Sequence, residues 1–273
     1  MKIEHIEITH PDRIIFTKKK ITKGDVVLYY EKAAEKMLPF LKNRPLTLQR
    51  FPDGIKEQGF YQKNASEYFP SFIKRIEIET EEGMNTQFLC NSKKALIYLA
   101  NQGAVTFHTW LSKKDKINHP DKIVFDLDPS KGDFSQIKKA AFLVKDFLEA
   151  KKIVPKIGST GQNGVHVSYK IRRTRTFDEI KKKTKEMAEE LVKLHPEIFT
   201  TQIRKNKREG KIFLDYLRNE YAQTIVCPFS LRANEEAGIA VPLDWDQFEN
   251  ISNSKEFNFS NIENYLKKNY FRF

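Results

Sequence analysis

Two aspartates one residue apart, Asp126 and Asp128, end the apolar run Lys-Ile-Val-Phe-Asp-Leu-Asp. Side chains at positions i and i+2 of a strand point to the same face, so these two carboxylates would lie side by side. Two negative charges that close repel each other unless a proton or a cation lies between them. All-oxygen ligation is typical of Mg²⁺ or Mn²⁺. The pair therefore predicts a divalent-metal site, with a plain Asp-Pro turn at a strand end as the alternative.

A third carboxylate, Asp215, lies inside the apolar stretch Ile212-Phe-Leu-Asp-Tyr-Leu217. An unpaired charge buried in such a stretch would cost several kcal/mol, so Asp215 needs a partner. If a neighbouring strand brings it to the first two aspartates, the three carboxylates could hold two metal ions ~4 Å apart, an arrangement that serves phosphoryl transfer. A structural ion pair with a lysine is the alternative.

The segment Gly158-Ser-Thr-Gly-Gln-Asn-Gly-Val-His166 lies between these acidic stretches and contains three glycines. Its backbone N–H groups could face phosphate oxygens, with the hydroxyl of Ser159 or Thr160 and the imidazole of His166 as further donors. It is not a Walker A loop, because no Lys-Ser/Thr pair follows the last glycine. A hairpin turn is the alternative. Arg232, which follows an apolar strand, could bind a triphosphate with both arms of its guanidinium.

Arg50 and Lys63 flank an aromatic pair, Phe60 and Tyr61, in the N-terminal part of the chain. Aromatic rings beside cations are typical of surfaces on which nucleic-acid bases stack. Adjacent residues of a strand face opposite ways, so we expect at most one ring of the pair to stack. Burial of both rings in the core is the alternative.

The charge balance supports a polyanionic partner. Among 273 residues, 48 Lys and Arg against 36 Asp and Glu give a net charge of +12, while 40% hydrophobic and 12% aromatic residues argue against a disordered basic tail. The two cysteines, Cys90 and Cys227, stand in no zinc-binding pattern and cannot form a disulfide framework. No run is long and apolar enough for a membrane helix, so we expect a cytoplasmic, nucleoid-associated protein without a membrane partner.

Helical and extended patterns alternate along the whole chain without a repeat or a linker. We predict helices over residues 22–41, 92–102, 133–152, 176–194 and 261–268, and strands over residues 46–50, 59–61, 72–78, 122–128, 164–171 and 211–217. This alternation predicts an α/β (α+β) fold with mixed central β-sheets flanked by helices. We treat residues 1–273 as a single domain, with the DNA-end and aromatic residues in 1–110 and a catalytic sheet in 111–273.

Five motifs occur in a fixed order along the chain. They are His108-Thr-Trp-Leu-Ser112, His119-Pro-Asp-Lys-Ile-Val-Phe-Asp-Leu-Asp-Pro129, the glycine-rich segment ending Gly164-Val-His166, Phe213-Leu-Asp-Tyr-Leu-Arg-Asn219 and Pro228-Phe-Ser-Leu-Arg-Ala233. This series resembles the polymerase domain of bacterial DNA ligase D, in the archaeo-eukaryotic primase superfamily. The N-terminal half is similar as well, at Thr9-His-Pro-Asp-Arg13, Ile21-Thr-Lys-Gly-Asp25, Arg44-Pro-Leu-Thr-Leu48 and Pro52-Asp-Gly-Ile55. The similarity spans essentially the whole chain and implies a primase-like catalytic core.

The resemblance implies a role for each matching position. Asp126, Asp128 and Asp215 match the catalytic carboxylates that bind the metal ions. The nucleotide-binding residues that the resemblance implies are His108, Thr160, Gly164, His166 and Arg232. We also expect Arg50, Lys63, Ser159 and Arg218 to bind nucleotide. Phe60 and Tyr61 match the pair that supports bases, and Arg13 and Lys23 match residues that bind a 5′-phosphate at a recessed DNA end.

The chain departs from the family pattern in its glycine-rich loop. Family loops usually read Ser-Gly-x-Lys-Gly, whereas Asn163 stands at the lysine position and Thr160 at the serine position. The threonine keeps a hydroxyl, but a neutral amide offers no charge to a triphosphate, so nucleotide affinity or metal dependence should differ. Arg218 occupies a position where some relatives have glutamine.

The resemblance implies a template-dependent nucleotidyltransferase, a DNA-directed DNA/RNA polymerase that extends or gap-fills DNA ends with ribonucleotides or deoxyribonucleotides during non-homologous end joining. The implied cofactors are two Mn²⁺ or Mg²⁺ ions. The implied partners are nucleoside triphosphates, DNA ends with 3′ overhangs or gaps and a 5′-phosphate, a Ku-like protein and a DNA ligase. The sequence shows no ligase or phosphoesterase signature, so we expect a stand-alone polymerase or an excised domain. A metal-dependent nuclease, a stand-alone primase and an inactive DNA-end binding module are the alternatives.

Overall fold

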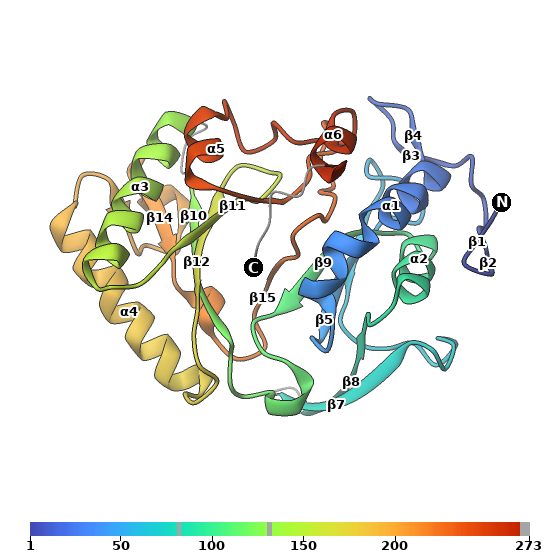
Figure 1. Ribbon diagram of the computed structural model, residues 1–273, viewed down its shortest axis with the longest axis horizontal. Helices are drawn as coiled ribbons and strands as arrows, with labels where there is room; N and C mark the ends of the chain where they lie inside the picture. The colour runs from blue at the N-terminus through green and yellow to red at the C-terminus, as the bar shows by residue number, and fades with distance from the viewer. Residues whose placement is uncertain (81–82, 130–132, 268–273) are drawn as a thin grey trace.

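A six-stranded mixed β-sheet forms one half of the protein, as the computed structural model shows for residues 1–80, 83–129 and 133–267 (Figure 1). The strand order is β13-β14-β10-β12-β11-β16, and every pair is antiparallel except β13 and β14. The strands are β10 (Lys122–Asp128), β11 (Lys156–Ser159), β12 (Val165–Lys170), β13 (Phe199–Thr200), β14 (Ile212–Asp215) and β16 (Val241–Leu243). This sheet confirms the prediction of a mixed sheet flanked by helices.

A four-stranded antiparallel sheet forms the other half, in the order β15-β9-β5-β6. Its strands are β5 (Leu46–Arg50), β6 (Phe60–Gln62), β9 (Ala104–Trp110) and β15 (Thr224–Val226). Three two-stranded sheets complete the β-structure, from β1 (Lys2–Ile3) with β2 (Ile6–Glu7), β3 (Ile14–Phe16) with β4 (Ile21–Thr22), and β7 (Lys74–Thr80) with β8 (Gly83–Leu89). Because β15 comes from the C-terminal part of the chain, the two parts of the sequence are interleaved in this sheet.

Six α-helices cover the sheets. They are α1 (Lys23–Leu41), α2 (Lys93–Asn101), α3 (Phe134–Ala150), α4 (Phe177–Leu194), α5 (Trp245–Asn250) and α6 (Ile262–Lys267), counted over the described residues. Helix α3 packs against β10, β12 and β14, while α1 and α2 pack on each other and against β9 (Figure 1). None of the described helices combines the length and the hydropathy needed to cross a membrane.

Helix α1 shows how the sequence sets the packing. A capping box fixes its start, because the Thr22 hydroxyl accepts from the backbone N–H of Asp25 and the Asp25 carboxylate accepts from the N–H of Thr22. One face of the helix is apolar and buried, at Val26, Tyr30, Ala33, Met37 and Leu41. The Tyr30 hydroxyl donates to the carbonyl of Val105 and accepts from the N–H of Leu231, which ties the helix to the four-stranded sheet and to the loop after it.

The predicted helices and most predicted strands are confirmed to within a few residues, with residue 268 outside the described part of the chain. The predicted strand 211–217 stops at Asp215, because the chain turns there into a 3₁₀ segment, η3 (Leu217–Asn219). The elements that were not predicted are helix α5 and strands β1, β2, β3, β4, β8, β9, β11, β13 and β16, while β15 is the apolar strand expected before Arg232. Strand β9 gives no alternating signal because six of its seven residues are buried, on both faces of the strand.

Candidate active site

A row of polar side chains crosses the middle of the six-stranded sheet. Asp126 on β10 lies directly opposite Asp215 on β14 and directly opposite His166 on β12. Residues paired across antiparallel strands project to the same face, and Asp128, two positions along β10, projects to that face as well. The register therefore brings the three predicted carboxylates and the predicted imidazole together. The adjacent row, Leu127, Leu214 and Val165, is fully buried and faces the other way.

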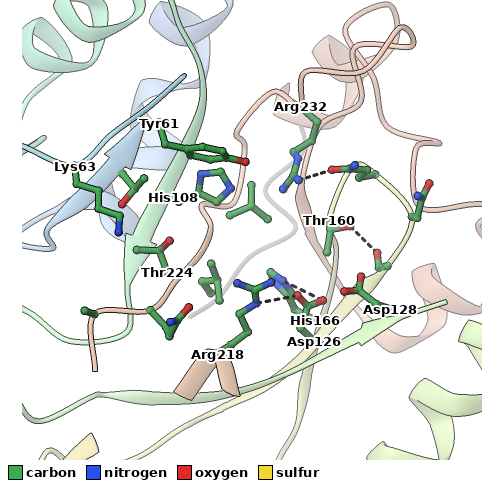
Figure 2. Close-up of a pocket in the computed structure, with 18 residues that line it drawn as sticks. Tyr61, Lys63, His108, Asp126, Asp128, Thr160, His166, Arg218, Thr224 and Arg232 are labelled. Carbon is green, nitrogen blue, oxygen red and sulfur yellow. Dashed lines mark hydrogen bonds and ion pairs between the residues drawn. The ribbon is translucent and has the colours of Figure 1, made fainter. Parts of the chain in front are cut away.

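Arg218 lies against two of these carboxylates. Its Nε atom is 3.1 Å from Oδ2 of Asp215. The same Nε atom is 3.6 Å from Oδ2 of Asp126, as Figure 2 shows. On the other side of Asp126, Nε2 of His166 is 3.6 Å from Oδ1. The ion pair expected as the alternative role of Asp215 thus exists, but its partner is an arginine in the site rather than a lysine.

The carboxylates influence one another's protonation. The negative charge of Asp126, together with burial and the charge of Asp215, raises the pKa of Asp128 to about 6. Burial likewise raises the pKa of Asp215, against the opposing effect of Arg218. Burial acts in the same direction on Asp126, but the nearby His166, Arg218 and Arg232 outweigh it and hold its pKa below the usual value. The nearby cations thus favour the charged form of Asp126, whereas the charged forms of Asp128 and Asp215 are disfavoured.

This donor set suits a divalent cation. Asp126 Oδ1 is buried and accepts no hydrogen bond from the described residues, and its ion-pair partner, Nε2 of His166, is 3.6 Å away, so this oxygen can still accept a closer ligand. Carboxylate oxygens are ligands that Mg²⁺ and Mn²⁺ prefer, and a cation would relieve the repulsion that raises the pKa of Asp128. Within the described part of the chain, however, no three acidic, imidazole or thiol groups are already arranged around a common metal position. The cation that the structure places beside Asp126 and Asp215 is the guanidinium of Arg218.

The glycine-rich loop between β11 and β12 closes against the carboxylates. The Thr160 hydroxyl donates to the carbonyl of Gly164, and a Cβ atom at Gly164 would lie 2.5 Å from the carbonyl oxygen of Leu127 and 3.0 Å from Oδ1 of Asp128. A side chain at position 164 would therefore push the loop away from β10. Arg232, the arginine predicted to bind a triphosphate, donates to the side-chain carbonyl of Gln162 (Figure 2). The tip of the glycine-rich loop is therefore in contact with this arginine.

The four-stranded sheet supplies the opposite wall. Thr47 on β5 and Val226 on β15 both lie across from His108 on β9, and Tyr61 on β6 shares their face, with its ring centroid 6.2 Å from that of His108. Burial and the charges of Arg232 and Arg218 lower the pKa of His108 to about 3. His108 is therefore neutral at physiological pH and acts as a hydrogen-bonding group rather than as a cation.

A cavity of about 450 Å³ lies between these two walls (Figure 2). It brings together most of the residues predicted to act in the site. Those that line it are Tyr61, Lys63, His108, Asp126, Asp128, Thr160, Gly164, His166, Arg218 and Arg232. Asn163, which replaces the family lysine, lines it as well, and Asp215 borders it through Arg218.

Two residues predicted to bind nucleotide do not line this cavity. Ser159, the last residue of β11, is 4% exposed, and its hydroxyl accepts from the N–H of Val241 on the neighbouring strand β16. The guanidinium of Arg50 donates to the carbonyl of Gln102 and stacks over the ring of Phe60 at 5.1 Å, because Arg50 pairs with Phe60 across β5 and β6. Phe60 and Tyr61 are 45% and 63% exposed on opposite faces, which excludes the alternative that both are core residues.

Arg13 and Lys23 form a separate basic site near the start of α1. The Lys23 ammonium donates to the carbonyl and the hydroxyl of Thr9, and burial together with the charges of Arg13 and Arg50 lowers its pKa to about 8. Arg13 pairs with Asp53 at 2.7 Å. Two guanidinium groups that disfavour the charge of Lys23 form with it a cationic site suited to an anion. The structure thus places Arg50 with the residues predicted to bind the 5′-phosphate.

Several cavity residues were not predicted from the sequence. Thr47, Gln162, Gln223 and Thr224 line the cavity, and Ser254 supports it by donating to the carbonyl of Gly164 at 2.6 Å. Gln162 could have been found, because it lies inside the glycine-rich segment. The others depend on strand pairing and on a loop about 90 residues away, which no local pattern indicates.

These features are those of a primase-polymerase, and residues 22–271 match the family model described as "LigD, primase-polymerase domain". The chain therefore belongs to the LigD primase-polymerase domain family. It is similar to the bifunctional non-homologous end joining protein LigD of Bacillus subtilis (strain 168), with 33% identity over 275 residues, covering 97% of this chain and 44% of the relative. It is also similar to the multifunctional LigD of Mycolicibacterium smegmatis, with 28% identity over 249 residues, covering 90% of this chain and 33% of the relative.

The fold is shared with a solved structure, the polymerase domain from Mycobacterium tuberculosis ligase D in complex with DNA. The TM-score is 0.90 at 23% identity, and the match covers 98% of this chain and 96% of that chain. This confirms the predicted primase-like fold. The chain spans less than half the length of the curated relatives named above.

Proposed function

We propose that this protein is a template-dependent nucleotidyltransferase that extends or gap-fills DNA ends with ribonucleotides or deoxyribonucleotides during non-homologous end joining. The observation that supports this most directly is the cavity, in which Asp126 and Asp128 face a glycine-rich loop, His166 and Arg232, while Asp215 pairs with Asp126 across the sheet and borders the cavity through Arg218. Phosphoryl transfer depends mainly on positioning and on charge neutralisation, and this cavity offers groups for both. Membership of the LigD primase-polymerase domain family supports nucleotidyl transfer as the class of reaction.

In the proposed reaction, the 3′-hydroxyl oxygen of a primer forms a bond to the α-phosphorus of a nucleoside triphosphate. The bond from the α-phosphorus to the bridging oxygen breaks, pyrophosphate leaves, and the hydroxyl proton is released to water. Asp126, Asp128 and Asp215 would hold two Mg²⁺ or Mn²⁺ ions. When bound, such ions lower the pKa of the attacking hydroxyl and neutralise charge on the leaving group.

The remaining cavity residues would orient the nucleotide. Arg232 would exchange its contact with Gln162 for the phosphates, and the Thr160 hydroxyl and His166 lie on the same side of the cavity (Figure 2). Neutral His108 offers hydrogen bonds without adding charge near the cations. The exposed ring of Tyr61 offers a surface on which a base could stack.

The DNA end would bind beside the nucleotide. Strand β6 separates the cavity, lined by Tyr61, from the cations Arg13, Lys23 and Arg50 on the face of Phe60. A 5′-phosphate bound among those cations would place the end of the recessed strand near the site of synthesis. Binding to phosphates should weaken steeply with salt. A Ku-like protein and a DNA ligase are further proposed partners.

Purified protein incubated with 3′-overhang DNA, Mn²⁺ and labelled triphosphates tests this function. Growth of the primer that is lost in Asp126→Asn but kept in Asp146→Asn, an exposed aspartate in the middle of α3, supports synthesis. Shortening of the DNA would instead indicate a nuclease, and retarded but unaltered DNA an inactive binding module. Products formed on a template without a primer would indicate a primase.

A further inference from the structure

Arg218 was predicted to bind nucleotide, but in the structure its guanidinium lies against two of the proposed metal-binding carboxylates. Its guanidinium lies against Asp126 and Asp215, whose residues are 8% and 6% exposed, while the arginine side chain is 37% exposed toward the cavity. A positive group beside two buried carboxylates compensates the charge repulsion between them. The guanidinium therefore does for the carboxylate row what a bound divalent cation would do.

The backbone that carries Arg218 is held firmly. The next residue, Asn219, donates to the carbonyl of Val124 at 2.7 Å and accepts from its N–H at 2.9 Å, so η3 is fixed to β10. The N–H of Leu217 donates to Oδ1 of Asp215 at 2.9 Å. Because Oδ1 is fixed in this way, Oδ2 of Asp215 faces Arg218. The side chain of Arg218 is thus the movable part of an otherwise fixed group.

We propose that Arg218 is a built-in counter-ion that competes with the divalent metal for Asp126 and Asp215. The inference rests on the proposed function, because it assumes that these carboxylates bind metal. The guanidinium contacts Oδ2 of both residues, and a metal ion that used the same oxygens would have to displace it. Asp126 lies opposite Asp215 in the sheet, so a single guanidinium is within reach of both carboxylates.

The cavity offers space for the Arg218 side chain once a metal ion displaces it from the carboxylates. Arg218 lines the cavity together with Lys63, His166 and Arg232, where a bound triphosphate would bring several negative charges. A triphosphate would attract the guanidinium away from the carboxylates at the moment when the metal needs them. Nucleotide and metal would then strengthen each other's binding by the same factor, as linkage requires.

Mn²⁺ binding to the full chain without nucleotide tests the competition, with free Mn²⁺ measured by electron paramagnetic resonance. Arg218→Gln, which keeps a polar side chain but removes the charge, should bind Mn²⁺ about tenfold more tightly than the wild type, because a charge-assisted contact no longer has to be broken. Arg173→Gln is the matched control, since it removes an arginine paired with Asp115 outside the cavity, and its affinity should be unchanged. Adding a non-hydrolysable triphosphate should raise the Mn²⁺ affinity of the wild type more than that of Arg218→Gln.

Equal or weaker Mn²⁺ binding by Arg218→Gln would overturn the inference. If Asp126→Asn abolishes Mn²⁺ binding while Arg218→Gln leaves it unchanged, the metal site stands and only the competition fails. If the wild type binds no Mn²⁺ even with triphosphate, the proposed function itself fails. Should Arg218→Gln not fold without metal, Arg218→Lys decides, because a lysine cannot span both carboxylates in the same way: tighter Mn²⁺ binding than wild type supports competition, and equal or weaker binding refutes it.

Discussion

Replacing a proposed catalytic carboxylate should make the metal-free protein more stable. Asp128 has a pKa of about 6 rather than 3.8, because the charge of Asp126, burial and the charge of Asp215 all oppose its ionisation. A difference of roughly 2 pKa units corresponds to about 3 kcal/mol of unfavourable free energy for the charged form, and screening by water makes this an upper bound. Asp128→Asn removes that charge and keeps the shape of the side chain.

The effect should depend on pH in a defined direction. Between about pH 4 and pH 6 the folded state keeps a proton on Asp128 that the unfolded state has lost, so the contribution of this group to stability falls as pH rises. Above about pH 6 the penalty is complete. The gain from Asp128→Asn should therefore be largest at pH 7.5, up to about 3 kcal/mol, and should nearly vanish at pH 4.

Urea denaturation in EDTA at both pH values measures this difference, and thermal melting should show an increase of at most about 10 °C at pH 7.5. Adding Mn²⁺ should stabilise the wild type more than the variant. Asp146→Asn is the control for loss of a negative charge at an exposed position, and its free energy of unfolding should change by less than about 0.5 kcal/mol. An Asp128→Asn protein that is no more stable than wild type at pH 7.5 would refute the view that the carboxylates repel one another in the folded state.

Three further predictions concern the loop and the DNA-end site. Lys23→Ala should abolish a preference of about tenfold for 5′-phosphorylated over 5′-hydroxyl ends in a binding assay, and in the wild type this preference should decline between pH 7 and pH 9, as the ammonium loses its proton around pH 8. Asn163→Lys should lower KM for the triphosphate in primer extension, while an unchanged KM would show that another cation serves in its place. Gly161→Ala should destabilise the protein by about 2 kcal/mol or more in urea, because its φ is +67° and a Cβ would lie 2.5 Å from the carbonyl carbon of Ile239. Gly210→Ala, with φ +81° and open space around it, should cost only about 1 kcal/mol.

The carboxylate row was predictable because its chemistry is local. A run of apolar residues that ends in two aspartates indicates a strand with two carboxylates on one face, and β10 spans the predicted residues. The approach of Asp215 was a hypothesis that required two distant segments to pair. The register places Asp126 opposite Asp215, and a shift of one residue would have turned Asp215 to the apolar face. Sequence pattern shows that such a residue needs a partner but does not show which one.

The locations of side chains that depend on strand pairing could not be predicted from the sequence. Arg50 and Lys63 stand on either side of the aromatic pair, yet Lys63 lines the cavity while Arg50 stacks on Phe60 near Lys23. The difference follows from the antiparallel pairing of Arg50 with Phe60 and from the alternation of faces along β6. Both residues are basic and close in sequence, so composition and spacing treat them alike.

The alternation of faces along β6 also relates the cavity to the basic site formed by Arg13, Lys23 and Arg50. Phe60 carries the guanidinium of Arg50 on one face of β6, and Tyr61, the next residue, contacts the cavity on the other face. A strand is only a few ångströms thick, so a nucleotide in the cavity and a DNA end among the cations would lie on opposite sides of one backbone. Loss of the Tyr61 ring should then affect nucleotide binding, whereas loss of the Phe60 ring should release Arg50 and affect DNA-end binding. In the proposed complex, the short strand β6 would keep the two anionic ligands apart and within reach of each other.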